Sequence, residues 1–210
     1  MDKVLAFGEV LLRLKSSGFE RLFQTQNMES VFGGSEANVA VSLAIFGKES
    51  EYVTALPDND IGRAVISSLS YYGVNVNSVN KEGRLGIYFF LFWACQRPSK
   101  VIYDRSQSCL AETPSSEYDW KSIMTDATWF HFSGVTPAVS QIAGDCAFDA
   151  IKTAKQMGAT VSLDLNYRKK LWKYGKSASQ VMTELAKMAD VIIANEEDIQ
   201  SCLGISLRNF

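Results

Sequence analysis

Strand-like and helix-like runs alternate along most of this chain, and this order constrains its fold more than any other feature. Short apolar runs are followed by longer runs whose apolar residues recur at helical spacing. Such alternation builds a parallel sheet with helices on both faces, so the sequence predicts an α/β fold. Strands are expected at 4–14, 50–57, 128–135, 159–166 and 190–198, the last leading into a helix, and further helices at 35–47, 61–72, 140–157 and 177–188.

Two segments interrupt this alternation. Residues 13–32 and 83–105 are rich in β-branched and aromatic residues, and the second holds two strand-like runs with no helix between them. We expect them to form a small antiparallel sheet, attached as a lid over a site at the ends of the parallel strands. The stretch ETPSSEYD at 112–119 is typical of a surface linker that rejoins lid and core.

Composition excludes several classes of function. The 210 residues are 47% hydrophobic with a net charge of −2, and no stretch gathers basic residues, so nucleic acid is not an expected partner. The first residues lack the long apolar core of a signal peptide or membrane helix, which favours a cytoplasmic protein with no membrane partner. The 4 cysteines form no CxxC pair, so we expect reduced thiols rather than a zinc site.

Familiar phosphate and catalytic motifs are absent from these residues. Neither Gly47-Lys48 nor Gly175-Lys176 has the earlier glycine that a P-loop needs, and Gly33-Gly34 are adjacent rather than spaced as in GxGxxG. His131 is the only histidine, and no GxSxG elbow accompanies it. We therefore expect a structural role for His131.

Two adjacent glycines stand between a strand-like run and a helix in VFGGSEANVAVSLAIFGKES, residues 31–50. Glycine leaves the backbone bare, so that a ligand can lie directly against it. Glycine also serves tight turns that pack a helix onto a strand. Both readings of Gly33 and Gly34 stay open at this point.

The stretch from GGSEAN to SYYGVNV resembles the N-terminal signature of the ribokinase-like (PfkB) sugar kinases. The runs GRLGIYFF, QRPSKVIYDR, FHFSGVTPAVS and LDLNYRKKLW are similar to one branch, the 2-keto-3-deoxygluconate kinases. The resemblance covers nearly all of residues 4–204. It implies a three-layer α/β/α fold with a β-sheet lid, with residues 1–210 forming one domain that is incomplete at its C-terminus.

The same resemblance implies a set of substrate-binding residues. Gly33 and Gly34 would lie against the sugar, and Val135 would line the pocket through its backbone. Arg105 and Arg168 would hold the carboxylate of a sugar acid, because a guanidinium matches a planar anion. The full expected set is Gly33, Gly34, Asn38, Tyr88, Tyr103, Arg105, Val135 and Arg168. For the arginines the alternative is a surface ion pair, and for the tyrosines it is sheet packing.

The run ANEED at 194–198 resembles the family's Asn-x-x-Glu motif, which helps to position magnesium and phosphates. Asn195 and Asp198 are the matching residues, although Asp198 is one methylene shorter than glutamate. The implied cofactors are ATP and Mg²⁺. The neighbouring glutamates can also be read as first-turn acids that favour the helix dipole. The bulky Phe92 and Trp93 favour a homodimer formed through the lid.

The resemblance also implies a C-terminal Asp-Thr-x-Gly-Ala-Gly-Asp motif that carries the catalytic base, and these 210 residues do not contain it. We therefore assign no catalytic residue here and expect no phosphorylation by this chain alone. The predicted function is ATP-dependent phosphorylation of the 6-hydroxyl of 2-keto-3-deoxygluconate. Fructokinase or another sugar kinase, a non-catalytic sugar-acid-binding module and a structural domain without ligand remain as alternatives.

Overall fold

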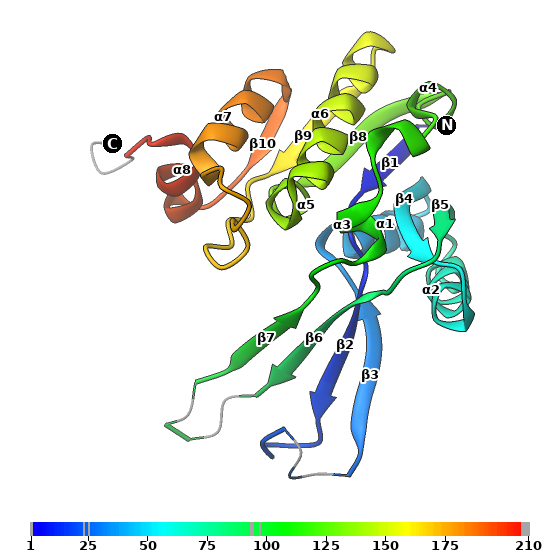
Figure 1. The fold of residues 1–210 in the computed structure, drawn as a ribbon. Coiled ribbons are helices and arrows are strands. Elements are labelled where there is room, and N and C mark those ends of the chain that lie inside the picture. The colour runs from blue at the N-terminus through cyan, green and yellow to red at the C-terminus, as the bar shows by residue number, and fades with distance from the viewer. Residues whose placement is uncertain (1, 23, 25, 93–94, 97, 207–210) are drawn as a thin grey trace.

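The computed structural model describes residues 2–22, 24, 26–92, 95–96 and 98–206. Its main sheet has 6 strands in the order β10-β9-β8-β1-β4-β5, and every neighbouring pair is parallel, which confirms the predicted α/β fold. The strands are β1 (Lys3–Phe7), β4 (Glu49–Pro57), β5 (Asn75–Lys81), β8 (Ala127–Ser133), β9 (Thr160–Asp164) and β10 (Val191–Ile193). Figure 1 shows this twisted sheet across the upper part of the molecule.

A second sheet of 4 strands projects from the core as the lid (Figure 1). Its strands are β2 (Leu11–Ser16), β3 (Met28–Gly33), β6 (Gly86–Leu91) and β7 (Lys100–Asp104), in the order β3-β2-β6-β7. The expectation of an antiparallel sheet is wrong for the central pair, because β2 and β6 are parallel. Both strands leave the core in the same direction, and β3 and β7 return antiparallel to them.

The apolar run at 4–14 is not one strand but two. It divides after Phe7, so that β1 belongs to the core and β2 to the lid. The division falls at Gly8, where a Cβ atom would overlap the carboxylate of Glu36. The buried Tyr52 hydroxyl donates a hydrogen bond to the Gly8 carbonyl at 2.8 Å. This joint places Glu9 where the two sheets meet.

Helices cover both faces of the main sheet. Successive residues of a strand point to opposite faces, so Leu5 and Phe7 join one apolar cluster while Ala6 joins the other. The first cluster is covered by α6 (Gln141–Gln156) and α7 (Ala178–Met188), and the second by α1 (Ser35–Ile45) and α2 (Asp60–Tyr71). The structure thus has the expected helix layers on either side of the sheet.

Local capping sets the ends of the longer helices. The Ser140 hydroxyl accepts a hydrogen bond from the Ala143 amide at 3.0 Å, and α6 is followed by Gly158 with a positive φ of 81°. Ser177 and Gln180 form a reciprocal capping box at the start of α7. These side chains explain why the helices start and stop close to the expected positions.

Two parts of the core differ from the sequence-based expectation. The edge strand β5 was not predicted, because an edge strand tolerates the polar side chains of NVNSVNK. The supposed linker at 112–119 is structured, and its Tyr118 is buried and stacked on Trp120 at 4.8 Å between ring centroids. The short helices of this part are α3 (Cys109–Glu112), η1 (Ser115–Glu117) and α4 (Trp120–Ile123).

The remaining helices are α5 (Val135–Val139), directly after β8, and α8 (Glu196–Leu203), directly after β10. Within the described ranges, no helix combines the length and apolar character needed to cross a membrane. Trp93, which contributed to the expectation of a lid dimer, lies outside the described residues.

Candidate functional site

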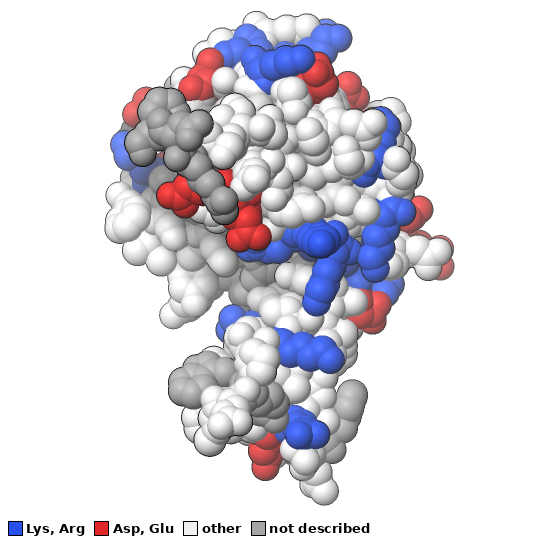
Figure 2. Space-filling view, turned by 90° about the vertical axis from the view of Figure 1, so that its left-hand side faces the viewer, with Lys and Arg blue, Asp and Glu red and all other residues white. Residues whose placement is uncertain are grey.

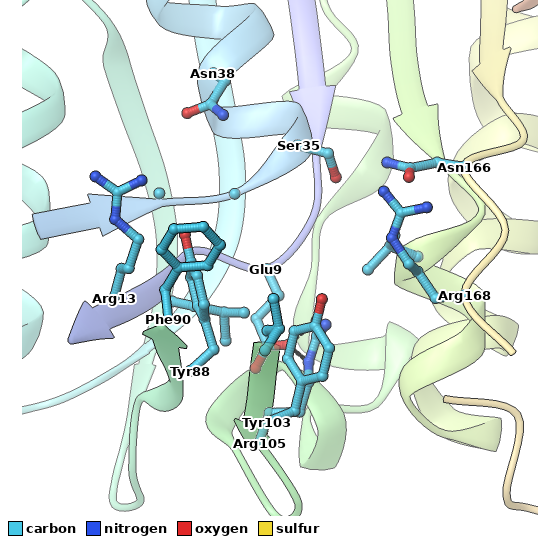
Figure 3. A pocket seen from close by; sticks show the side chains of 15 residues that line it. Glu9, Arg13, Ser35, Asn38, Tyr88, Phe90, Tyr103, Arg105, Asn166 and Arg168 are labelled. Carbon is cyan, nitrogen blue, oxygen red and sulfur yellow. Dashed lines mark hydrogen bonds and ion pairs between the residues drawn. The ribbon is translucent and has the colours of Figure 1, made fainter. Parts of the chain in front are cut away.

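A pocket of about 290 Å³ lies where the lid meets the carboxyl ends of the central strands (Figure 3). The structure brings all eight expected substrate-binding residues to this pocket, although they come from five separate stretches of sequence. The sequence did not identify the other lining residues, which are Glu9, Leu11, Arg13, Ser35, Phe90, Val101 and Asn166. Contact of any of these side chains with a ligand stays a prediction.

The two adjacent glycines have different surroundings. A Cβ atom on Gly33 would point into the pocket, at 3.8 Å from the Tyr88 hydroxyl and 4.0 Å from Asn38 Oδ1. A Cβ atom on Gly34 would instead overlap the carbonyl oxygen of Glu9. Gly33 therefore provides open backbone toward a ligand, whereas Gly34 permits the close packing of α1 against the joint between β1 and β2.

Arg105 and Glu9 form a buried ion pair at the base of the lid. The Arg105 Nε donates to Glu9 Oε2 at 2.7 Å, and Nη2 donates to the same oxygen. Arg105 is 7% exposed and Glu9 is 5% exposed. Glu9 Oε1 is also buried and has no hydrogen-bond partner among the described residues. Arg105 is thus neutralised by a carboxylate that the sequence analysis missed; the charged residue that breaks an apolar run at Gly8-Glu9 was the available signal.

Tyr88 and Tyr103 lie directly opposite each other on β6 and β7. Their ring centroids are 6.1 Å apart with planes tilted by 40°, and Arg105 lies 5.9 Å from the Tyr103 ring. Figure 3 shows both rings in the pocket beside Glu9. The lid therefore offers two phenol groups with apolar ring faces, which suits a sugar with hydroxyls on one side and carbon on the other.

Arg168 follows β9 on the core side of the pocket (Figure 3). The side chain is exposed, and its Nη1 donates to the carbonyl of the neighbouring Tyr167 at 2.9 Å. No carboxylate pairs with it in the part of the chain that the structure describes. Asn166 lies beside it with a positive φ of 36°. Arg168 consequently keeps its charge available to an anion.

Basic side chains surround this end of the pocket. Figure 2 shows Lys and Arg gathered on one side of the molecule where the core narrows toward the lid. Lys100, Lys170 and Lys173 line an adjoining hollow. This arrangement favours anionic ligands over neutral or cationic ones.

Glu36 is a buried carboxylate behind the pocket that the sequence analysis did not single out. Its Oε1 accepts hydrogen bonds from the Ser133 amide at 3.1 Å, the Ser133 hydroxyl at 2.7 Å and the Thr136 hydroxyl at 2.7 Å. Its Oε2 accepts from the Ser35 hydroxyl at 2.7 Å. Since charge-assisted bonds from several donors offset the cost of burying a carboxylate, Glu36 fixes the first turn of α1 against β8 and α5. Val135 is held there too, because its amide donates to the Ser133 hydroxyl at 3.3 Å.

His131 lies behind the site, and its side chain is enclosed. Its Nδ1 is 2.8 Å from the Ser162 hydroxyl, which also accepts a hydrogen bond from Trp129 Nε1 at 2.7 Å. Burial lowers the pKa of His131, while the negative charges of Glu36 and Asp164 oppose this shift. The histidine therefore packs in the protein interior, with no place in the pocket.

Asn195 and Asp198 lie at the start of α8, apart from the pocket. Asn195 Oδ1 accepts a hydrogen bond from the Asp198 amide at 2.8 Å and so caps the helix. Asp198 is 8% exposed. Burial raises the pKa of Asp164, and the negative charge of Asp198 adds to this shift. Asp164 ends β9, and Asp198 lies in the first turn of α8, which follows the neighbouring strand β10.

Comparison with known proteins identifies relatives across the whole chain. The sequence model of the pfkB family carbohydrate kinases matches residues 1–209. A curated relative, the 2-dehydro-3-deoxygalactonokinase of Haloferax volcanii, is 33% identical over 204 residues, which are 97% of this chain and 64% of that protein. The 2-dehydro-3-deoxygluconokinase of Thermoproteus tenax is 26% identical over 209 residues, which are 98% of this chain and 63% of that protein.

The fold has a close match among solved structures. The crystal structure of 2-dehydro-3-deoxygluconokinase from Thermotoga maritima superimposes with a TM-score of 0.94 at 44% identity. The match covers 100% of this chain and 64% of that one. The chain described here therefore spans about 64% of the length of the relatives it matches.

Proposed function

This chain belongs to the pfkB family of carbohydrate kinases, and from this premise we propose that it supplies the sugar-binding part of an ATP-dependent kinase. The substrate is 2-keto-3-deoxygluconate, the sugar acid after which the Thermotoga and Thermoproteus relatives are named. The reaction transfers the γ-phosphate of ATP to the 6-hydroxyl of this acid. The proposal concerns the complete enzyme, of which these residues form the acceptor side.

One observation carries this proposal: eight residues expected to bind a sugar acid converge on one pocket of about 290 Å³. The pocket combines two phenol groups, bare backbone at Gly33 and the guanidinium groups of Arg13 and Arg168, with which no acid of the described residues forms an ion pair. Charge-assisted hydrogen bonds to a guanidinium favour a carboxylate over a neutral hydroxyl. This charge argues for a keto acid rather than fructose.

The two carboxylates at the ends of β9 and β10 support the use of a metal ion. Mg²⁺ is commonly held by one or two carboxylates together with substrate phosphates and water. Asp164 and Asp198 have this donor chemistry: Asp164 ends β9, and Asp198 lies in the first turn of α8, directly after the neighbouring strand β10. Asp164 and Asp198 would hold Mg²⁺, which neutralises phosphate charge during phosphoryl transfer. Asn195 keeps these groups in place by capping α8.

We also propose that the 210-residue chain binds the acid without phosphorylating it, because no catalytic base is assigned within it. Isothermal titration calorimetry with 2-keto-3-deoxygluconate and with fructose tests the first half, and addition of ATP with Mg²⁺ followed by product analysis tests the second. Selective binding of the acid without product supports the proposal. Equal binding of both sugars would reject the substrate assignment. Formation of product would reject the claim that these 210 residues lack a catalytic base.

The galacto epimer is a second candidate substrate, because the curated relative at 33% identity is named for 2-dehydro-3-deoxygalactonate. The two acids differ in the configuration of one hydroxyl, so they share the charge on which the pocket argument depends. Titration of both epimers under the same conditions ranks them. A tenfold lower dissociation constant for one identifies the substrate.

A homodimer through the lid is a further part of the proposal. Leu14, Phe89 and Ile102 are register neighbours on the lid face opposite Tyr88, and Ile102 is 38% exposed. A row of apolar side chains on an outer sheet face favours association. Analytical ultracentrifugation should give a dimer that Phe89→Glu converts to a monomer. A monomer at all concentrations would reject the homodimer.

We propose a cytoplasmic location on the basis of the thiols. Cys109, Cys146 and Cys202 are buried and free, and Cys95 is exposed and free. Free thiols of this kind persist in reducing compartments. Localisation of a tagged protein tests this proposal.

A further inference from the structure

Arg13 is an arginine in the pocket that the expected substrate set does not include. It lies on β2, between Val31 of β3 and Tyr88 of β6, and its side chain lines the pocket. Figure 3 shows it beside Phe90, at the opposite end of the pocket from Arg168. Its Nε is buried and has no hydrogen-bond partner among the described residues. A guanidinium N–H withdrawn from water and left unpaired indicates a place that an acceptor can fill.

Three other basic side chains in or next to the lid are paired with acids. Arg105 pairs with Glu9, Arg84 with Asp104 at 2.7 Å, and Lys15 with Glu29 at 2.8 Å. Lys15 is two residues from Arg13 on the same strand. In the described part of the chain, no acid pairs with Arg13. Arg13 is therefore a pocket arginine whose partner must come from outside the lid.

Two cations that line the pocket have no acid partner within the described ranges. Glu9 and Arg105 neutralise each other, so Arg13 and Arg168 remain, one at each end (Figure 3). A sugar acid has one carboxylate, and its far end must point to the phosphate donor. One end of the pocket therefore binds the carboxylate, and the other end lies toward the phosphate donor.

The surroundings decide which end takes the carboxylate. Arg168 follows β9, and its side chain is exposed to water. An ion pair formed in contact with water is weak, because both charges stay hydrated. The Arg13 end faces apolar and phenolic lid residues, where a charge-assisted hydrogen bond is stronger because water is excluded.

Resting on the proposed function, we propose that Arg13 binds the substrate carboxylate and sets the preference for acids over neutral sugars. The sugar chain then runs across Tyr88 and Tyr103, and its terminal hydroxyl lies near Arg168, toward β10 and α8. This orientation differs from the sequence-based expectation, which assigned the carboxylate to Arg105 and Arg168.

The test compares two ligands that differ only in charge, 2-keto-3-deoxygluconate and its carboxamide. Calorimetry with the 210-residue chain measures both against Arg13→Gln, Arg168→Gln and the wild type. Arg21→Gln is the matched control, because this exposed lid arginine carries the same charge but does not line the pocket. We expect Arg13→Gln to weaken binding of the acid about 10- to 100-fold and to leave the carboxamide unchanged. Arg168→Gln should weaken both ligands in similar proportion, and Arg21→Gln neither.

Each other outcome is also decisive. If Arg13→Gln binds the acid as well as the wild type does, or loses both ligands equally, the carboxylate assignment is overturned while the proposed substrate stands. If the wild type binds neither ligand, the proposed substrate and this inference both fail. Thermal unfolding distinguishes a ligand-binding role of Arg13 from a structural one. Because Arg13→Gln removes a buried donor that has no partner, the melting temperature of the free chain should not fall.

Discussion

The pocket and the start of α8 both lie at the carboxyl ends of parallel strands, yet their polar groups are used differently. Among the residues that the structure describes, no acid pairs with Arg13 or Arg168 of the pocket, and no donor reaches the buried Glu9 Oε1. At α8, the Asn195 side chain is occupied by capping the helix. Pocket groups that stay unpaired are available to a ligand, whereas the Asn195 side chain already serves to stabilise its own helix.

The largest effect is expected from the ion pair that supports the pocket. Glu9→Gln leaves the charge of Arg105 buried without a carboxylate, which should lower the free energy of unfolding by about 3 kcal/mol. Urea unfolding at pH 7 measures this loss. Glu29→Gln removes a carboxylate from an exposed lid pair with Lys15 and should cost less than about 1 kcal/mol.

The Glu29→Gln control shows whether burial of the Glu9–Arg105 pair accounts for the loss of stability. If both glutamine variants lose the same stability, the buried pair does not organise the base of the pocket. Adding Arg105→Gln to Glu9→Gln should restore part of the loss, because the buried charge is then gone.

The two glycines provide the next test. Gly34→Ala forces the Glu9 backbone away and should cost about 1–3 kcal/mol of stability as overpacking. Gly33→Ala meets only side-chain atoms at ordinary contact distance, so stability should be nearly unchanged while ligand affinity falls. Urea unfolding and calorimetry on both variants check the pair. Equal losses of stability would show that both glycines serve packing alone.

Asn195→Ala tests the other region of the comparison. Removing the cap of α8 should lower the free energy of unfolding by about 1 kcal/mol. It should leave sugar affinity unchanged, since Asn195 does not line the pocket. Asn195→Asp is the conservative control, because aspartate caps helices equally well. Weaker sugar binding by Asn195→Ala would mean that the two regions are coupled.

Much of the fold was accessible from the sequence because strand and helix periodicity is local. The runs that became β4, β8, β9, α6 and α7 could each be read from their own residues. The split of the first run at Gly8 could not, since it depends on the Glu36 carboxylate from another segment. The parallel pairing of β2 with β6 likewise depends on how two separate segments leave the core.

The lining of the pocket was predictable to a similar degree, for the same reason. Residues such as Tyr88 and Arg168 lie in recognisable motifs. Glu9 and Arg13 lie in an apolar run whose pattern predicts only a strand, and their roles depend on partners distant in sequence. A buried carboxylate and an unpaired arginine become visible only when the two sheets are brought together.

The smallest effect concerns His131, which lies between the two regions. The pKa of His131 in the folded state is lowered, chiefly by burial. As the pH falls below about 6.5, the ordinary pKa of histidine, the unfolded chain therefore binds more protons than the folded chain. Stability should therefore decline as the pH falls from 7 toward 5. Asp164 acts with the opposite sign, because its raised pKa lets the folded state hold a proton more tightly in acid. Asp164 affects stability in a pH range that begins at about 3.8, the ordinary pKa of an aspartate. Its effect therefore opposes that of His131 only at the acid end of the range from pH 7 to pH 5.

Because this chain contains 1 histidine, the variant His131→Gln isolates its contribution. Melting temperatures of the wild type and of His131→Gln, recorded from pH 7 to pH 5, should converge on lowering the pH, since only the wild type pays for charging a buried imidazole. Parallel curves would mean that the histidine is protonated as easily in the folded chain as in the unfolded one. In that case His131 does not contribute to the loss of stability in acid.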